Sequence, residues 1–212
     1  MRTIFHDRTK MILSCAFIVI FGLSLIGSPY PEYLFLQHIP TLIAFIVVPM
    51  WDRRWPLSPG AFACLLAMLV LHVIGARYTY SFVPYDTWCQ TVSGYRLSEV
   101  FDLERNHYDR LVHFLFGLLL VYPMQEILLR KSGITTAWSY FIAVNCITAF
   151  SAVYEILEAI AALIVSPELG AAYLGTQGDE WDAQKDSLLA FGGAVIAMFI
   201  SWHYTRRNAA PA

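Results

Sequence analysis

Residues 137–165 decide the fold, and they read AWSYFIAVNCITAFSAVYEILEAIAALIV. The run is apolar except for a few small polar residues and two acids, Glu155 and Glu158. It exceeds the ~20 apolar residues that a helix needs to cross a bilayer. Five further stretches approach or meet that length: 11–28, 33–50, 59–76, 111–129 and 187–204. The sequence therefore predicts an all-α polytopic membrane protein, with six transmembrane helices in one integral membrane domain over residues 1–212.

The composition favours the same class. Of the 212 residues, 58% are hydrophobic and 14% are charged, whereas a soluble domain carries about 25% charged residues. The net charge of −2 comes without a basic stripe, which excludes a nucleic-acid-binding protein. The four cysteines show no CxxC spacing, so neither a disulfide framework nor a cysteine metal site is predicted. The expected surroundings are the lipid bilayer.

Lys and Arg orient the bundle, because basic residues accumulate on the cytoplasmic side. With the N-terminus inside, nine of the 14 lie in inner segments: Arg2, Arg8, Lys10, Arg53, Arg54, Arg130, Lys131, Arg206 and Arg207. Both termini are therefore expected in the cytoplasm. The first apolar stretch resembles a signal peptide, but its removal would spoil this pattern, so we interpret it as an uncleaved helix. Two long connections, 77–108 and 166–186, then face outward, and we expect the aromatic-rich first one to lie on the bilayer or across the bundle.

The predicted fourth span opens with a polar pair. Asp109 and His113 are four residues apart and therefore share one helix face. Two alternatives stay open. Asn106 could cap the helix and leave Asp109 as a favourable first-turn charge, and His113 could be a buried structural histidine with a hydrogen-bond partner.

Glu155 and Glu158 lie inside the fifth span, three residues apart on one face. A charged group at the centre of a membrane helix costs at least ~2.5–3.5 kcal/mol, so such residues usually have a role. Two close carboxylates do not ionise together easily, and we expect one to hold a proton unless a cation lies between them. The alternative is an interhelical hydrogen bond from a protonated glutamate.

Asp182 and Asp186 lie one turn apart at the start of the last span, ahead of Gly192 and Gly193, which allow close helix approach. Asp179 and Asp182 could instead simply cap this helix.

In the predicted topology, all three pairs belong to the outer half of the bundle. The candidate catalytic residues are Asp109, His113, Glu155, Glu158, Asp182 and Asp186. All of them except Asp182 are also candidate ligands for a hard divalent cation, which prefers oxygen. The sequence therefore predicts an outward-facing polar site.

Four segments resemble the YjdF-type family of bacterial inner-membrane proteins, which has no established activity. They are GARYTY at 75–80 with Pro84, RNHYDRLVHF at 105–114, Tyr154-Glu155 with Glu158, and LGTQGDEWDAQKD at 174–186. The resemblance implies a multi-pass protein of the bacterial inner membrane. Within these motifs, the candidate substrate-binding residues are Arg110, Tyr154, Thr176, Gln177 and Asp179.

A wider similarity is to VanZ-like membrane proteins, some of which are linked to glycopeptide antibiotic resistance. Their pattern matches Asp109, Arg110, His113, Phe114, Glu155, Asp186 and Gly193. Neither resemblance supplies a substrate.

Three functions are compatible with these residues. The first is an enzyme, dependent on a metal or on acid–base chemistry, that acts on a lipid or lipid-linked envelope substrate. The second is a binding or transport module that uses the acids for ion or proton passage. The third is a structural membrane module in which the acids make interhelical hydrogen bonds. The sequence contains no HExxH, GxSxG or P-loop, which excludes several familiar enzyme classes.

Overall fold

The computed structural model describes residues 2–131 and 133–208, in which every regular element is a helix. The elements are η1 Ile4–His6, α1 Arg8–Leu25, α2 Leu34–Arg54, α3 Pro59–Arg77, α4 Tyr85–Ser93, α5 Leu97–Val100, α6 Tyr108–Lys131, α7 Thr136–Ile164, α8 Pro167–Leu174 and α9 Asp182–Asn208. Six of them are long and apolar enough to cross a membrane: α1, α2, α3, α6, α7 and α9. The prediction of an all-α protein with six spanning helices is confirmed. Positions 1, 132 and 209–212 lie outside the described residues. The side chains of Lys131, Arg206 and Arg207, three of the nine basic residues assigned above to inner segments, are not described either.

Polar residues, rather than the edges of the apolar runs, set where α1, α6 and α9 begin. Asp7 accepts two backbone N–H groups at the start of α1. The Asn106 side chain accepts the N–H of Tyr108 at 3.0 Å, so α6 begins three residues before the predicted span. Asp179 accepts the N–H of Trp181 immediately before α9. These acceptors satisfy backbone donors that have no partner within a helix, and the helices therefore extend into their polar flanks.

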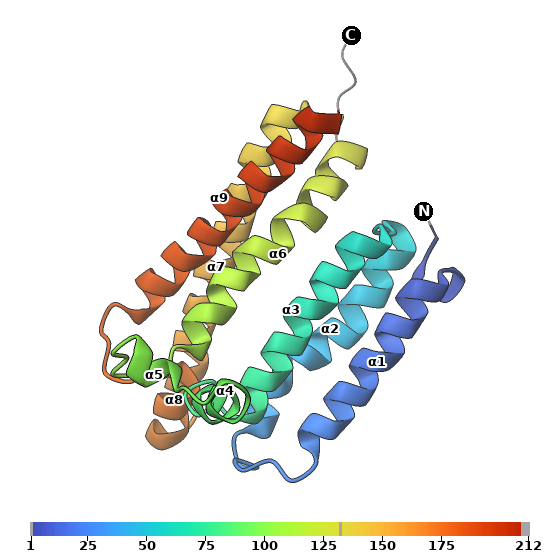
Figure 1. Ribbon diagram of the computed structural model, residues 1–212. Helices are drawn as coiled ribbons and strands as arrows, with labels where there is room; N and C mark the ends of the chain where they lie inside the picture. Colours follow the sequence, from blue (N-terminus) through green and yellow to red (C-terminus); the bar gives the residue numbers. More distant parts are fainter. Residues whose placement is uncertain (1, 132, 209–212) are drawn as a thin grey trace.

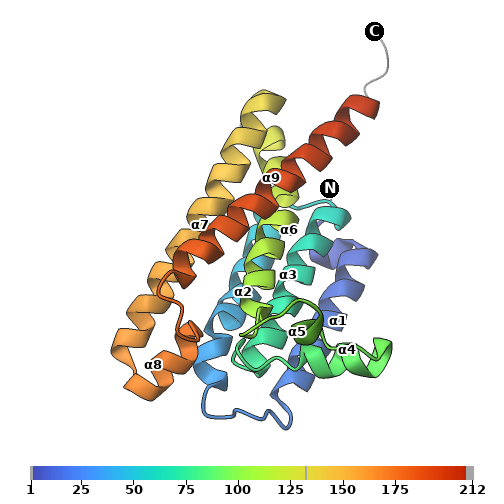
Figure 2. The ribbon, with the colours of Figure 1, turned by 60° about the vertical axis from the view of Figure 1, so that its left-hand side comes forward.

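The spanning helices form two groups (Figure 1). The helices α1, α2 and α3 pack together, and α6, α7 and α9 form the other group, which α9 crosses obliquely (Figure 2). The contact between α3 and α6 joins the two groups. Three short helices, α4, α5 and α8, lie at one end of the bundle, and the start of α1 and the end of α9 lie at the opposite end (Figure 1).

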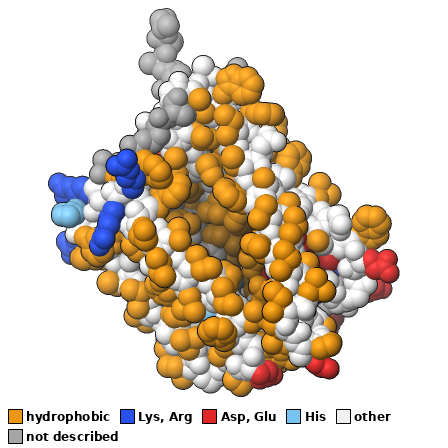
Figure 3. Space-filling view, turned by 180° about the vertical axis from the view of Figure 1, so that it is seen from behind, with side chains coloured by type: hydrophobic (Ala, Val, Ile, Leu, Met, Phe, Trp, Pro, Cys, Tyr) orange, Lys and Arg blue, Asp and Glu red, His pale blue; other side chains and the backbone are white. Residues whose placement is uncertain are grey.

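On the face shown in Figure 3, the charges are unevenly distributed between the two ends. The visible Lys and Arg side chains lie toward the end where α1 begins, and the visible Asp and Glu side chains lie toward the other. We call these the inner and outer ends, as the sequence predicts, and the assignment of the inner end to the cytoplasm stays a prediction.

Glycines let α6 and α9 approach closely. A Cβ atom added to Gly193 would overlap the backbone of Phe114, and one added to Gly117 would overlap the backbone of Ala190. A Cβ at Gly192 would meet nothing within 4 Å. Of the two glycines that the sequence singled out, Gly193 therefore makes the approach, with Gly117 as its counterpart on α6. The crossing brings the start of α9 beside the start of α6.

A buried ion pair links α1 to α2 at the inner end. Lys10 of α1 is fully buried, and its Nζ lies 2.6 Å from Asp52 Oδ1. Asp52 also accepts the backbone N–H groups of Ile4, at 2.6 Å, and of Leu57, at 3.3 Å. Lys10 Nζ donates a further hydrogen bond to the Arg2 carbonyl at 2.9 Å. The first apolar stretch is thereby tied into the bundle, and Lys10 does not serve as a free surface charge.

Candidate functional site

His113 connects α6 to α7 near the outer end. Its Nε2 lies 3.0 Å from Glu155 Oε1 and 3.7 Å from Asp109 Oδ1. Its Nδ1 lies 3.1 Å from the hydroxyl of Ser151, one turn before Glu155 on α7. The side chain of His113 is 8% exposed, and those of Asp109 and Glu155 are 15% and 13% exposed. The structure thus brings the first predicted pair and Glu155 of the second together around one imidazole.

Asp186 of α9 completes this cluster. Three possible ligand atoms lie within 4.8 Å of one another: one carboxylate oxygen of Asp109, one of Asp186 and one ring nitrogen of His113. Asp186 is buried, with 1% of its surface exposed. We call Asp109, His113, Glu155 and Asp186 the acid–histidine centre.

Two oxygens of the acid–histidine centre have no hydrogen-bond partner among the described residues. They are Glu155 Oε1 and Asp186 Oδ1, and both are buried. Glu155 Oε1 lies 3.0 Å from His113 Nε2, so this ion pair is its one polar contact among the described residues. A buried carboxylate oxygen without a partner costs roughly 1–3 kcal/mol or more, so this arrangement favours a bound cation or a bound proton. Carboxylate oxygens with one imidazole suit either a divalent metal or proton transfer.

Glu158 lies one turn beyond Glu155, beside a pair of tyrosines. Tyr173 of α8 forms a side-chain hydrogen bond with Tyr154. Burial and the nearby Glu158 carboxylate raise the pKa of Tyr173 to about 12, although the hydrogen bond from Tyr154 opposes the shift. The ring of Tyr154 is 6.4 Å from that of His113. Glu158 and the predicted substrate-binding residue Tyr154 therefore flank the centre on its α7 side.

Asp182 lies in a different environment, which we call the arginine rim: Arg105, Arg110, Asp179, Asp182 and Lys185. Arg105 Nη1 lies 2.6 Å from Asp182 Oδ1, and Arg110 Nη2 lies 2.5 Å from Asp179 Oδ2. Lys185 Nζ also lies 2.5 Å from Asp179 Oδ2. The rim places two arginines and one lysine against two aspartates at the outer end.

The remaining predicted substrate-binding residues also belong to this outer layer. The hydrogen bond from Lys185, followed by that from the Trp181 N–H, lowers the pKa of Asp179 to about 2. Gln177 exchanges two hydrogen bonds with the backbone of Asn106, at 2.9 and 3.0 Å. Thr176 contributes its carbonyl, which accepts a hydrogen bond from Arg105 at 3.0 Å. These contacts fasten the segment before α9 to the segment before α6.

Sequence reasoning missed one group near the centre, a buried tyrosine–histidine pair from the first half of the chain. The Tyr80 hydroxyl lies 2.5 Å from His72 Nδ1. Burial, and then the carboxylates of Asp109 and Glu158, raise the pKa of Tyr80 well above its ordinary value. Tyr80 has a φ of 56°, and its ring lies where a Cβ at Gly75 would be. The sequence signal for this contact is Gly75, five residues before Tyr80, within the segment 75–80 that resembles the YjdF-type family.

Arg105 was missed in the same way. It lay within the quoted segment 105–114, but nothing in the sequence alone paired it with Asp182, which is 77 residues away.

Comparison with known proteins identifies a family model and a relative that match the chain. The family described as "Predicted membrane protein (DUF2238)" matches residues 9–207. The inner membrane protein YjdF of Escherichia coli (strain K12) is 35% identical over 165 residues, which cover 77% of this chain and 74% of that protein. No solved structure matches. The match to an inner membrane protein agrees with the six apolar helices, and the chain is a multi-pass protein of that membrane.

Proposed function

The chain belongs to the DUF2238 family of predicted membrane proteins, and we propose that it is an enzyme of the outer half of the membrane that acts on a lipid or lipid-linked envelope substrate. In this proposal the acid–histidine centre holds a divalent cation. Asp109, His113 and Asp186 are its ligands, with Glu155 beside them as a further ligand or as the general base.

The observation that carries the proposal is an excess of buried carboxylate: Asp186 Oδ1 is buried without a hydrogen-bond partner among the described residues, and Glu155 Oε1 has only His113, at ion-pair distance. In a structural module each buried charge would have a partner, because an unpaired one is costly. Here three carboxylates surround a single histidine. A cation supplies the missing positive charge and would polarise a bound ester or phosphoryl oxygen.

The position of the centre supports a substrate drawn from the membrane. Its residues lie on helices of membrane-spanning length and apolarity. The segment before α6 carries exposed aromatics of the kind that favour the membrane interface, including Trp88 at 43% exposed and Phe101 at 66%. The arginine rim lies beside the centre, and its three basic side chains outnumber its two aspartates, an excess of positive charge that suits an anionic headgroup. These features favour a lipid whose polar head enters at the outer interface.

One observation favours a second candidate, proton or ion passage. His38 and His72 are buried in the first half of the bundle, and the Nε2 atom of each has no hydrogen-bond partner among the described residues. Tyr80 joins His72 to the neighbourhood of Asp109. A complete pathway also needs polar groups toward the inner end, where the charges of Lys10 and Asp52 satisfy each other.

The test is the metal content of the purified protein, equilibrated with Mg²⁺ or Mn²⁺ and washed. We expect one ion per wild-type chain and its loss in Asp186→Asn and Glu155→Gln. Glu180→Gln is the matched control, because Glu180 is an exposed acid next to the rim, and it should keep the ion. Wild-type protein without bound metal would contradict the proposal that the centre holds a cation.

Incubation with an envelope lipid extract, followed by mass spectrometry, then tests catalysis. Product should form with wild type and not with Asp186→Asn. Proton flux through wild-type liposomes, without any lipid turnover, would instead support the second candidate.

A further inference from the structure

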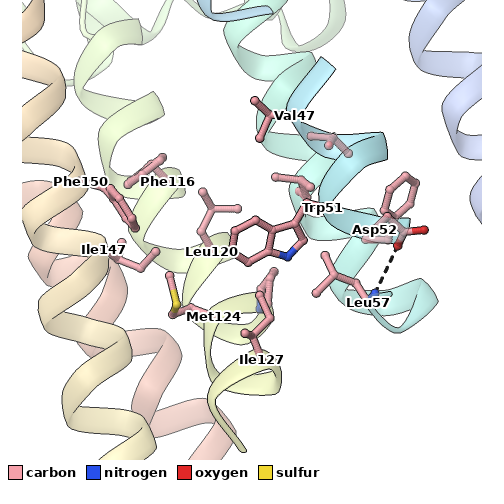
Figure 4. Close-up of a pocket in the computed structure, with 14 residues that line it drawn as sticks. Val47, Trp51, Asp52, Leu57, Phe116, Leu120, Met124, Ile127, Ile147 and Phe150 are labelled. Carbon is pink, nitrogen blue, oxygen red and sulfur yellow. Dashed lines mark hydrogen bonds between the residues drawn. The ribbon is translucent and has the colours of Figure 1, made fainter. Parts of the chain in front are cut away.

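An apolar groove lies between α2 and α3 on one side and α6 and α7 on the other (Figure 4). Phe116, Leu120 and Ile127 of α6 lie across it from Trp51 of α2. Seen from behind, the molecule is hollowed at its centre among hydrophobic side chains (Figure 3). The cavity measures about 210 Å³, below the ~300–1,000 Å³ of pockets that enclose a whole small ligand. It has room for a segment of one chain rather than for an entire molecule.

The lining of the groove selects hydrocarbon. Asp52 is the one charged residue among its described lining residues, and both of its carboxylate oxygens are engaged by Lys10 and by the backbone N–H groups of Ile4 and Leu57. No free charge is therefore left in the groove to bind a headgroup. Because the groove lies between helices that cross the membrane, its occupant comes from the bilayer.

The groove continues the helix face that carries the acid–histidine centre. On α6, one stripe runs through Asp109, His113, Phe116, Leu120 and Ile127. The intervals between these residues are four, three, four and seven, each close to one or two helical turns, so they share one face. At 1.5 Å per residue, the first and last of these are ~27 Å apart along the helix axis. Half of a hydrocarbon core ~30 Å thick is only ~15 Å. A chain that begins at the centre and reaches the end of the groove therefore crosses the midplane.

The facing helix shows the same alignment. On α7, the groove residues Ile147 and Phe150 lead, one turn further on, to Tyr154, which flanks the centre. Ser151, which contacts His113, directly follows Phe150. Both helices thus present apolar residues below the polar ones on matching faces.

We propose that the groove holds the tail of the substrate whose polar head lies at the acid–histidine centre, and that this tail is one long isoprenoid chain. An acyl chain of a diacyl lipid spans about one leaflet and would end before the inner end of the groove, whereas a long isoprenoid chain reaches it. The substrate class is then a polyprenyl-linked envelope lipid. This inference rests on the proposed function, because it takes the head to lie at the centre.

Binding of three lipids to the purified protein tests the groove. The probes are undecaprenyl phosphate, farnesyl phosphate and dioleoyl phosphatidic acid, measured by native mass spectrometry in detergent. We expect undecaprenyl phosphate to bind about tenfold or more tightly than the other two. Leu120→Trp should fill the groove and reduce that affinity to the level of farnesyl phosphate. Leu129→Trp, at a position 40% exposed on the same helix, should leave it unchanged, and melting temperatures verify that both variants fold.

Equal affinity for the three lipids, or equal effects of the two tryptophan substitutions, would overturn the assignment of the groove. Tightest binding of phosphatidic acid, removed by Leu120→Trp, would overturn it in favour of a diacyl occupant. The metal measurement separates this inference from the proposed function. If the wild-type protein binds the ion but shows no preference for chain length, only the groove proposal is wrong. If it prefers the long chain but binds no ion, the proposed cation is wrong and the groove proposal stands.

Discussion

The molecule buries charge at both ends, and the two sites differ in how far that charge is satisfied. At the inner end, Lys10 and Asp52 are surrounded by partners, with each Asp52 oxygen accepting at least one hydrogen bond. At the outer end, three carboxylates share the single His113. Asp186 Oδ1 has no hydrogen-bond partner among the described residues, and Glu155 Oε1 has only its ion pair with His113. A buried charge in a membrane protein is therefore not by itself a sign of function. The sign is a buried charge that its own fold leaves unpaired.

The largest effect should come from breaking the satisfied site. Lys10→Met leaves Asp52 buried without its counter-charge, which costs about 3–5 kcal/mol. The melting temperature in detergent should fall sharply, while metal binding at the outer end, measured below the new transition, should persist. A variant as stable as wild type would show that the inner pair does not hold α1 against α2.

Gly193→Ala should have the next largest effect, because its Cβ would overlap the Phe114 backbone. Overpacking of this kind costs about 1–3 kcal/mol, and here it would also move Asp186 away from His113. Lower stability and weaker metal binding should therefore appear together. Gly192→Ala is the matched control, since nothing lies within 4 Å of its Cβ, and a comparable loss there would refute the close-crossing explanation.

Removing a charge from the acid–histidine centre should have a smaller effect of opposite sign. In the presence of a chelator, Asp186→Asn and Glu155→Gln should keep or raise stability by about 1 kcal/mol, because an amide is cheaper to bury than a carboxylate and one histidine cannot neutralise three carboxylates. Thermal unfolding with and without chelator measures this. Destabilisation of both variants in chelator would mean that these acids are structural.

The smallest effect concerns the arginine rim and depends on pH. The pKa of Asp179 is about 2 in the folded protein, below its ordinary value of 3.8. A depressed pKa contributes stability that is present above about pH 4 and is lost as the pH falls toward 2. Asp179→Asn should therefore lower the melting temperature slightly at pH 7, and the difference from wild type should shrink below pH 4. A difference that does not change with pH would exclude the ion pairs as its cause.

The fold and part of the site could be predicted from the sequence, for distinct physical reasons. Apolar length alone gives the six helices, because a bilayer demands it. The i, i+4 spacing of Asp109 and His113 places them on one face whatever the tertiary structure. The proximity of Glu155 to His113 followed from topology together with the expected cost of burying an acid.

Other features depend on contacts between distant segments and carry no local pattern. The pairing of Arg105 with Asp182, the Tyr80–His72 contact and the role of Gly117 all arise where separate helices meet. Lys10 shows the converse. A positive-inside count treats it as a free charge, whereas the tertiary structure neutralises it with Asp52.

The most direct test of the central claim is a crystal structure of the protein with Mn²⁺, read by anomalous scattering. The account predicts one peak at the outer end, about 2.0–2.6 Å from oxygens of Asp109 and Asp186 and in contact with His113, and none beside Asp52. A well-ordered acid–histidine centre without a peak, in which Glu155 and Asp186 instead hydrogen-bond to neighbouring protein groups, would contradict it.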